Sequence, residues 1–276
     1  MSGGIVWLAA YPKSGTTWLR IFLANLVSGA SQPYNINMLR HFGYSDSRAS
    51  LYERAAGKPL AVLDMAHLHR LRPIVHKLVA NLKNDTTFVK THNAIAVRDG
   101  IATITPETTR GAIYVVRNPL DVSVSYAHHF AMRIDDVIRA MASPDNLLAT
   151  VERSVFSYLG SWSGHVSSWT EAAGLNPHVI RYEDMLTKPV PSFRAVASYL
   201  GLEADREQVE RAVRFSAFDE VQGQERRHGF AESGPVDNVF FRRGQAGEWR
   251  QVLKPAQVDA VVAAHGEVMQ RYGYLP

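Results

Sequence analysis

The chain has 276 residues, of which 46% are hydrophobic and 20% charged. This balance is typical of a globular protein, and it excludes a disordered tail, a collagen-like fibre and a coiled-coil rod. Because cysteine is absent, disulfides, thiol nucleophiles and cysteine-based metal sites are excluded as well. The net charge of +4 favours anionic partners such as phosphates, nucleotides or nucleic acid. Of the 30 basic residues only 7 are Lys, so the position of each Lys is informative.

No membrane-spanning segment is visible in the sequence. The most apolar stretch, residues 18–27, carries Arg20 and Asn25 and is shorter than the roughly 20 residues that a bilayer requires. The first twelve residues, MSGGIVWLAAYP, lack a charged leader region, so we expect a first strand rather than a signal peptide. We therefore expect a cytosolic protein that does not bind membranes.

Short apolar runs alternate with helical patterns along the chain, which is typical of buried parallel strands in an α/β fold. We expect strands within 4–12, 86–92, 111–119 and 178–185. The first helix is expected to follow residue 15 and to end at Gly29, and another to begin at Asn118 with Pro119 in its first position. Further helices are expected at 154–173, 190–200, 205–214 and 256–271.

The chain shows no internal repeat and no linker, so we expect one domain over residues 1–276. Two segments, 31–60 and 222–241, are polar and irregular. We expect both to contain mobile loops that face the substrate, although surface loops are more often simple connections.

Polar chemistry follows each predicted strand, at the edge where parallel sheets bind ligands. The first strand runs through YPKSGTTW (11–18) directly into a helix. Gly15 allows close approach of an anion, the helix start presents free N–H groups, and Lys13, Thr16 and Thr17 add donors. The sequence therefore predicts a phosphate cradle, with a simple capped turn as the alternative.

This loop departs from the Walker A pattern of nucleotide kinases and GTPases. Ala10 stands where that pattern requires the first Gly, and Lys13 precedes Gly15 instead of following it. No later strand ends in an Asp suited to hold Mg²⁺, so we expect the anion to bind without a metal.

Four motifs together resemble the 3′-phosphoadenosine 5′-phosphosulfate (PAPS)-dependent sulfotransferases. The loop YPKSGTTW is similar to the 5′-phosphosulfate loop of that family, and the other three occur in the family's order: VKTHNA (89–94), VVRNPLDVSVSY (115–126) and FFRRGQAGEW (240–249). The resemblance spans nearly the whole chain. It implies a P-loop-like three-layer α/β fold with a central parallel sheet flanked by helices.

The resemblance also implies sulfuryl transfer from PAPS to a hydroxyl or amine of a small-molecule acceptor, with PAP as the product and no metal required. It is closest to the cytosolic type, and we expect a bacterial enzyme. Three groups of donor-binding residues follow from it. Those at the 5′-phosphate and its sulfuryl bond are Lys13, Ser14, Gly15, Thr16 and Thr17. Those at the 3′-phosphate are Arg117, Ser125, Arg242, Arg243 and the backbone N–H of Gly244. Those at the adenine are Trp18, Tyr182, Ser216 and Phe218.

The same resemblance assigns the catalytic residues. Lys13 contacts the phosphate–sulfate bridge and Lys90 the sulfuryl oxygens. His92 is the expected general base, since its ordinary pKa of roughly 6.5 suits proton removal from the acceptor. Lys90 and His92 are two residues apart, which places them on one face of an extended strand. Alternatives stay open: Arg117 could form a structural ion pair, and Trp18 could belong to the core.

The sequence departs from the family pattern at three places. Asn93-Ala94 replaces the usual Leu-Pro after the histidine, and Arg243 and Glu248 replace the usual Lys and Asp. The vertebrate dimer segment would fall where Pro255 stands. Proline lacks a backbone N–H, so we do not expect that dimer, and the oligomeric state stays open.

Three other classes of protein are disfavoured by the sequence. A P-loop nucleotide kinase is disfavoured by the missing Walker A order. An Arg-rich nucleic-acid-binding protein is disfavoured because the Arg residues alternate with acids. A zinc enzyme built on His67, His69 and His76, or on His128 and His129, lacks the usual ligand spacing. The acceptor is expected to be a phenol or lipophilic alcohol, from an aromatic and histidine-rich set: His41, Phe42, Tyr44, His128, His129, Phe130 and Phe230.

Overall fold

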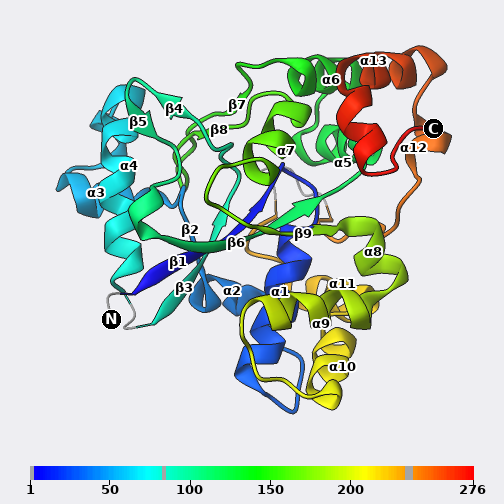
Figure 1. The fold of residues 1–276 in the computed structure, drawn as a ribbon, viewed down its shortest axis with the longest axis horizontal. Helices are drawn as coiled ribbons and strands as arrows, with labels where there is room; N and C mark the ends of the chain where they lie inside the picture. The colour runs from blue at the N-terminus through cyan, green and yellow to red at the C-terminus, as the bar shows by residue number, and fades with distance from the viewer. Residues whose placement is uncertain (1–2, 83–84, 234–238) are drawn as a thin grey trace. The chain divides into compact units, whose positions relative to one another are not determined.

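The computed structural model describes residues 3–82, 85–233 and 239–276, and Figure 1 labels its helices and strands. The chain forms two compact units, each assembled from three separate stretches. Unit 1 comprises Met1–Tyr11, Gly43–Tyr114 and Ala140–Pro177. Unit 2 comprises Pro12–Phe42, Val115–Arg139 and His178–Pro276. Since the chain passes repeatedly between the units, no single boundary along the sequence separates them, and one domain over 1–276 stays a prediction.

A central sheet confirms the predicted α/β class. Its five parallel strands have the order β2-β3-β1-β6-β9. Within unit 1, β1 (Gly4–Ala10) and β2 (Tyr44–Ser45) pair with β3 (Thr86–Thr91). All of β1 is buried, as expected for a strand covered on both faces. The other two strands are β6 (Thr109–Val116) and β9 (His178–Arg181).

In unit 1, a long helix packs on the strands of the sheet. The long helix α4 (Met65–Ala80) packs on β1, β3 and α3 (Ala49–Ala56). Trp7 of β1 is fully buried, and its indole N–H donates to Thr109 Oγ1 at 2.9 Å. The remaining elements of the unit are β4 (Val97–Arg98), β5 (Ile101–Ala102), β7 (Leu147–Leu148), β8 (Ser157–Tyr158) and α7 (Trp162–Thr170).

The predicted helix at 154–173 is wrong over its first eight residues. Only α7, Trp162–Thr170, is helical, and Ser157–Tyr158 pairs with β7 instead. Gly160 has a left-handed backbone with φ of 64°, which a helix cannot contain, and Ser161 then caps α7 by accepting from Gly164 N.

In unit 2, helix α1 (Thr16–Ser28) packs against α10 (Arg206–Phe215), which also contacts α9 (Pro189–Tyr199) and α11 (Phe218–His228). Figure 1 shows these helices side by side. As predicted, α1 ends at Gly29, whose φ is 59°. The remaining α-helices of the unit are α2 (Leu39–Phe42), α5 (Pro119–Phe130), α8 (Tyr182–Thr187), α12 (Trp249–Val252) and α13 (Pro255–Arg271). Helix α6 (Ile134–Ala142) has its first six residues in unit 2 and its last three in unit 1.

The cap predicted for α5 is confirmed. The Asn118 side chain accepts from Leu120 N at 3.0 Å, and Pro119 occupies the first helical position. The helices predicted at 190–200, 205–214 and 256–271 agree within a residue with α9, α10 and α13.

The loop expected at 222–241 is wrong over its first seven residues, which belong to α11. This helix buries Val221 together with the polar residues Gln224 and Glu225, so an apolar periodicity is absent from its sequence. Residues 234–238 lie outside the described residues. Part of the segment 31–60 also forms helices, α2 and α3, and the expected mobility of both segments stays a prediction.

Candidate active site

The loop between β1 and α1 in unit 2 is shaped to receive an anion. Lys13 and Gly15 have left-handed backbones, with φ of 69° and 108°. Gly15 is the N-cap of α1 and, having no side chain, leaves the first-turn N–H groups without a side-chain acceptor. Ser14 is fully buried, and its Oγ has no hydrogen-bond partner among the described residues. A buried donor beside a helix N-terminus fits a phosphate oxygen.

An aromatic and a guanidinium group lie against this loop. A Cβ at Gly15 would come within 2.7 Å of the Tyr182 ring, so only glycine fits there. Tyr182 also contacts Trp18 edge to face, with ring centroids 5.9 Å apart, and the Arg117 guanidinium lies 4.2 Å from the Tyr182 ring centroid. The structure thus brings together four residues that the sequence assigned to the nucleotide.

Arg117 connects two of the sequence motifs. Its Nη1 donates to the Lys13 carbonyl oxygen at 3.0 Å, and its Nη2 donates to the Gln245 carbonyl oxygen at 3.1 Å. Its Nε is buried and has no partner within the described part of the chain. Arg117 therefore holds the first loop against the 240–249 segment and keeps a donor for an anion. Ser125, its predicted companion, is half-buried on α5.

The segment 240–249 presents further basic groups. The Arg242 guanidinium pairs with both carboxylate oxygens of Glu248, at 2.7 Å from Nη1 to Oε1, and Arg243 Nε lies 3.3 Å from the same carboxylate. Glu248 thus orients both arginines, and the two ion pairs help to lower the pKa of Glu248 against the opposing effect of burial. The acid that departs from the family pattern still pairs with the predicted phosphate-binding arginines.

Phe218 and Ser216 occupy different environments. Gly244, with φ of 59°, packs its backbone against the Phe218 ring, which a Cβ would overlap. Ser216 is fully buried, and its hydroxyl donates to the Val213 carbonyl at 3.1 Å. Phe218 is therefore beside the segment predicted to bind the 3′-phosphate, whereas Ser216 already closes the last turn of α10.

Positive charge gathers around this part of unit 2. Burial is the largest cause that lowers the pKa of His128, followed by the positive charges of Arg242 and Lys13. The Lys13 ammonium also lies 4.2 Å from the Phe240 ring centroid. A bound anion would lie in a favourable field, so the side chains present fit a phosphorylated nucleotide.

Unit 1 carries the other predicted catalytic residues, Lys90 and His92, at the end of β3. His92 Nδ1 lies 2.7 Å from the Ala10 carbonyl oxygen. Since a carbonyl only accepts, Nδ1 carries the proton in the neutral imidazole and Nε2 is the basic nitrogen. The Ala10 carbonyl precedes Lys13 by only three residues in the chain.

The backbone of His92 is held by a buried histidine. His165 Nε2 lies 3.1 Å from the His92 carbonyl oxygen, and its Nδ1 lies 2.8 Å from the Tyr114 hydroxyl. Burial lowers the pKa of His165 to about 4, so this ring is neutral at physiological pH. It donates from Nε2 to His92 and accepts from Tyr114, which fixes the strand end.

The residues that flank His92 meet a buried carboxylate that the sequence did not reveal. Asp46 Oδ2 accepts from Thr91 Oγ1 at 2.7 Å and from Asn93 Nδ2 at 2.8 Å. Arg72 Nη1 lies 3.8 Å away, and both charged groups are buried. Burial raises the pKa of Asp46, and the Arg72 charge is the largest opposing influence. Asn93, which departs from the family pattern, is thus part of a local hydrogen-bond network.

Several residues of the expected acceptor set have structural roles. Phe230 is buried in a core cluster of unit 2, and Phe42 packs against that cluster. His129 contacts Phe130 and Phe240 edge to face. Phe230 is therefore a core residue, whereas His128 and His129 stay candidates on α5.

The alternative zinc sites are not supported. His69 Nε2 bonds to the Arg98 carbonyl at 2.8 Å, and His76 Nδ1 to Thr105 Oγ1 at 2.8 Å. Over residues 3–82, 85–233 and 239–276, no three metal-binding side chains lie together. Among the same residues, no helix is both long and apolar enough to cross a membrane.

The fold and these features define a phosphate-binding α/β protein, in which a glycine turn leads from the first strand into a helix N-terminus. The model of the Sulfotransferase domain family matches residues 5–273. The chain therefore belongs to this family and is a sulfotransferase.

Known relatives are distant but cover most of the chain. Sulfotransferase 1A1 of Canis lupus familiaris is 25% identical over 276 residues, covering 96% of this chain and 83% of the relative. Flavonol 3-sulfotransferase of Flaveria bidentis is 24% identical, covering 93% and 78%. Two crystal structures share the fold. A mouse sulfotransferase complexed with PAP has 20% identity and a TM-score of 0.62, covering 98% of this chain and 85% of its own. Retinol dehydratase with retinol and PAP has 18% identity and a TM-score of 0.66, covering 98% and 82%.

Proposed function

We propose that this sulfotransferase takes the sulfuryl group from PAPS and transfers it to a hydroxyl or amine of a small-molecule acceptor. The observation that carries the proposal is the meeting of three separated motifs in unit 2. Arg117 bonds to the Lys13 carbonyl and the Gln245 carbonyl, so one guanidinium joins the phosphate loop to the C-terminal basic segment. Such a site suits a nucleotide with phosphates at two positions.

The donor is held by its phosphates and its base. The 5′-phosphate is assigned to the loop of Ser14, Gly15, Thr16 and Thr17 at the start of α1. The 3′-phosphate is assigned to Arg117, Ser125, Arg242, Arg243 and the Gly244 N–H, with adenine between Trp18, Tyr182 and Phe218. Ser216 is assigned to the adenine only because it lies two residues before Phe218. Its hydroxyl already donates to a backbone carbonyl at the end of α10.

Bound PAPS supplies a sulfuryl group on a phosphate leaving group, and sulfotransferases need no metal ion for this chemistry. We assign Lys13 to the bridging oxygen, where it neutralises charge as the bond to sulfur breaks, and Lys90 to the sulfuryl oxygens. In an in-line displacement the acceptor oxygen bonds to sulfur, and PAP leaves with the bridging electrons.

His92 is assigned as the general base for the acceptor proton. The bond from Nδ1 to the Ala10 carbonyl leaves Nε2 as the nitrogen that takes up the proton. Because a fixed ring orientation is needed for proton transfer, this hydrogen bond supports the assignment.

We assign the acceptor class from side chains of the expected set that lie outside the core cluster of unit 2. His128, His129 and Phe130 lie on α5 and suit a phenol or lipophilic alcohol. Relatives named for a flavonol and a structure that contains retinol support this class. The bacterial source, the cytosolic location and the oligomeric state stay open predictions.

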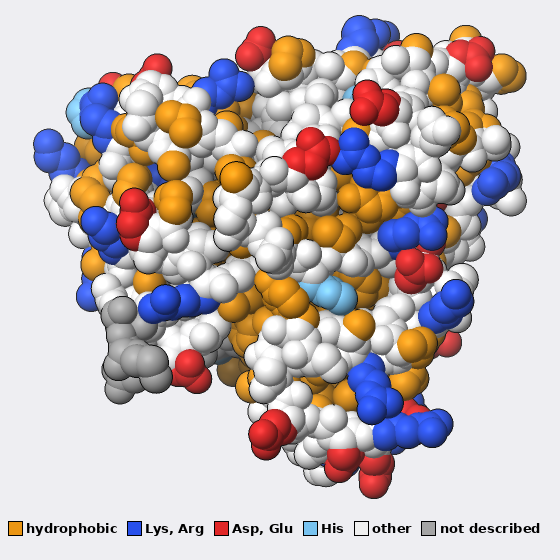
Figure 2. Space-filling model, in the orientation of Figure 1, with side chains coloured by type: hydrophobic (Ala, Val, Ile, Leu, Met, Phe, Trp, Pro, Cys, Tyr) orange, Lys and Arg blue, Asp and Glu red, His pale blue; other side chains and the backbone are white. Residues whose placement is uncertain are grey.

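A nucleic-acid-binding function is not favoured. On the face shown in Figure 2, basic side chains are scattered and acidic ones lie among them, without a continuous basic stripe. A phosphate backbone is usually bound by such a stripe.

The proposal is tested with PAPS that carries labelled sulfate and a panel of phenols, sterols, alcohols and amines, analysed by mass spectrometry. PAP binding is measured by calorimetry in the same preparation. We expect tight PAP binding and label on at least one acceptor class, with or without a chelator. Absence of both PAP binding and transfer would overturn the proposal.

A further inference from the structure

Three of the five residues expected to bind the 3′-phosphate, Arg242, Arg243 and Gly244, lie in an irregular segment without helix or strand. Such a segment binds an anion well only if its backbone is held in one conformation before the ligand arrives. In unit 2 the helix α11 supplies that support through one of its faces.

Glu225 makes the main contact. Its Oε1 accepts from the Phe240 N–H at 2.7 Å, and its Oε2 accepts from the Phe241 N–H at 2.9 Å. Glu225 is buried, and a buried carboxylate needs donors of this kind. Both oxygens are thus engaged by consecutive backbone groups immediately before Arg242, which fixes the direction in which the chain enters the phosphate-binding residues.

Two further residues on α11 contact the same segment. Gln222 Nε2 donates to the Phe241 carbonyl at 2.7 Å, and the Phe218 ring lies against the Gly244 backbone. The three residues are spaced four and three apart, so they share one face of the helix. The segment is therefore contacted from Phe240 to Gly244 by a single helical face.

The far end of the segment is held in the same way. Asp121 of α5 accepts from the Gly247 N–H at 2.7 Å and from the Trp249 N–H at 3.1 Å. Two buried carboxylates thus bond to backbone N–H groups on either side of Arg242 and Gly244. Neither needs to contact the nucleotide itself.

We propose that Glu225 is a positioning residue for the 3′-phosphate: it holds residues 240 and 241 so that Arg242, Arg243 and the Gly244 N–H converge on that phosphate. This inference rests on the proposed function, since it concerns the binding of PAP and PAPS. It gives Glu225 a role in nucleotide selectivity, because Arg242, Arg243 and the Gly244 N–H are assigned to the 3′-phosphate, whereas residues 14–17 are assigned to the 5′-phosphate.

The test compares two nucleotides by calorimetry: PAP, and adenosine 5′-phosphosulfate, which lacks the 3′-phosphate. Glu225→Gln keeps the size of the side chain but replaces one acceptor oxygen by an amide N–H₂ group, which repels a backbone N–H. We expect PAP affinity to fall about tenfold or more, whereas affinity for adenosine 5′-phosphosulfate changes less than about twofold.

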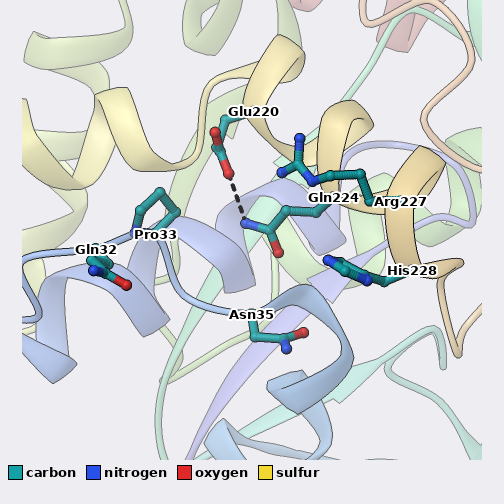
Figure 3. A pocket seen from close by; sticks show the side chains of 7 residues that line it. All are labelled: Gln32, Pro33, Asn35, Glu220, Gln224, Arg227 and His228. Atoms are coloured by element: carbon teal, nitrogen blue, oxygen red, sulfur yellow. Dashed lines mark hydrogen bonds between the residues drawn. The ribbon is translucent and has the colours of Figure 1, made fainter.

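The matched control is Glu220→Gln on the same helix. Figure 3 shows Glu220 bonded to Gln224 at a pocket with Gln32, Pro33 and Asn35. None of the residues that line this pocket belongs to 240–244. This control should leave both affinities unchanged. Gln222→Ala removes one hydrogen bond to Phe241 and should lower PAP affinity by less than Glu225→Gln does, without changing the affinity for adenosine 5′-phosphosulfate. If Glu225→Gln does not fold, this variant tests whether α11 positions the segment.

The possible outcomes separate the two proposals. If the wild-type chain neither binds PAP nor transfers labelled sulfate, the proposed function is wrong and the positioning role falls with it. If it binds PAP but Glu225→Gln weakens both nucleotides equally, or weakens neither, the positioning role is wrong and the proposed function stands.

Discussion

The Nδ1 atom of His92 lies 2.7 Å from the carbonyl oxygen of Ala10. This hydrogen bond joins the end of β3 to the last residue of β1, the neighbouring strand in the sheet. It fixes the tautomer of the imidazole and the direction of its Nε2. The role of His92 can therefore be tested separately from its structural bond.

His92→Asn keeps a donor near the position of Nδ1 and removes the basic Nε2. We expect turnover to fall by about 10²-fold or more, the usual contribution of a general base, while PAP affinity stays within about twofold of wild type. Initial rates with labelled PAPS and an acceptor that is sulfated by the wild type measure turnover, and calorimetry measures PAP affinity. Turnover within tenfold of wild type would contradict the assignment.

Gly244→Ala tests the packing on Phe218 of the segment proposed to bind the 3′-phosphate. A Cβ there would overlap the Phe218 ring, and φ is 59°. We expect PAP affinity to fall about tenfold or more, because the ring and the segment must separate. Calorimetry with PAP measures this loss.

Gly29→Ala is the matched control for that variant. Gly29 has the same φ of 59°, and nothing lies within 4 Å of its Cβ position. The backbone strain of about 1 kcal/mol is therefore common to both variants, and Gly29→Ala should lower stability without changing PAP affinity. Equal PAP affinity in the two variants would mean that the Phe218 contact has no role in binding.

Asn93→Leu introduces the side chain usual in the family and should destabilise this chain. Asn93 is fully buried; it donates to Asp46 at 2.8 Å and accepts from Tyr158 N at 2.9 Å. Leucine would leave both partners without these bonds, at a cost of about 3 kcal/mol. Urea unfolding measures the loss. The control Asn81→Leu changes an exposed residue and should cost less than about 1 kcal/mol. A loss below that level at Asn93 would show that the network adapts.

Three buried histidines predict acid sensitivity of unfolding. Burial lowers the pKa of His76 to about 3 and those of His165 and His265 to about 4. An unfolded histidine binds a proton near pH 6.5, so below that pH the unfolded chain holds more protons than the folded chain. These histidines therefore do not lower the free energy of unfolding above about pH 6.5. As the pH drops toward 4, the free energy of unfolding decreases by roughly 3 kcal/mol for each histidine.

Urea unfolding between pH 7.5 and 4.5 measures this dependence. His76→Asn keeps a possible donor to Thr105 and removes one titrating group. The free energy of unfolding should then decrease less over this range than in wild type. Its slope against pH should correspond to the uptake of close to one proton fewer on unfolding. An unchanged slope would show that His76 takes up its proton equally in both states.

The order of buried strands and helices was predictable because it depends on local patterns. The apolar runs at 4–12 and 86–92, the Asn118-Pro119 cap and the Gly29 terminator all act within a few residues. The helix at 218–228 was not predicted, and its residues 222–228 were expected in a loop, because Gln224 and Glu225 are buried polar residues. Their burial depends on partners more than ten residues away.

The sequence by itself determined the family of this protein and located the residues predicted to act: the loop with Lys13 and Gly15, the Lys90 and His92 pair, and the basic segment at 240–249. These are contiguous motifs, and their residue types indicate the chemistry of the ligands that they can bind. Only the tertiary structure decided how they are held. Glu225 bonding to Phe240 and Phe241, and Asp46 bonding to Thr91 and Asn93, join residues distant in the chain. A buried carboxylate is stable only where folding brings donors to it, and no local pattern identifies those donors.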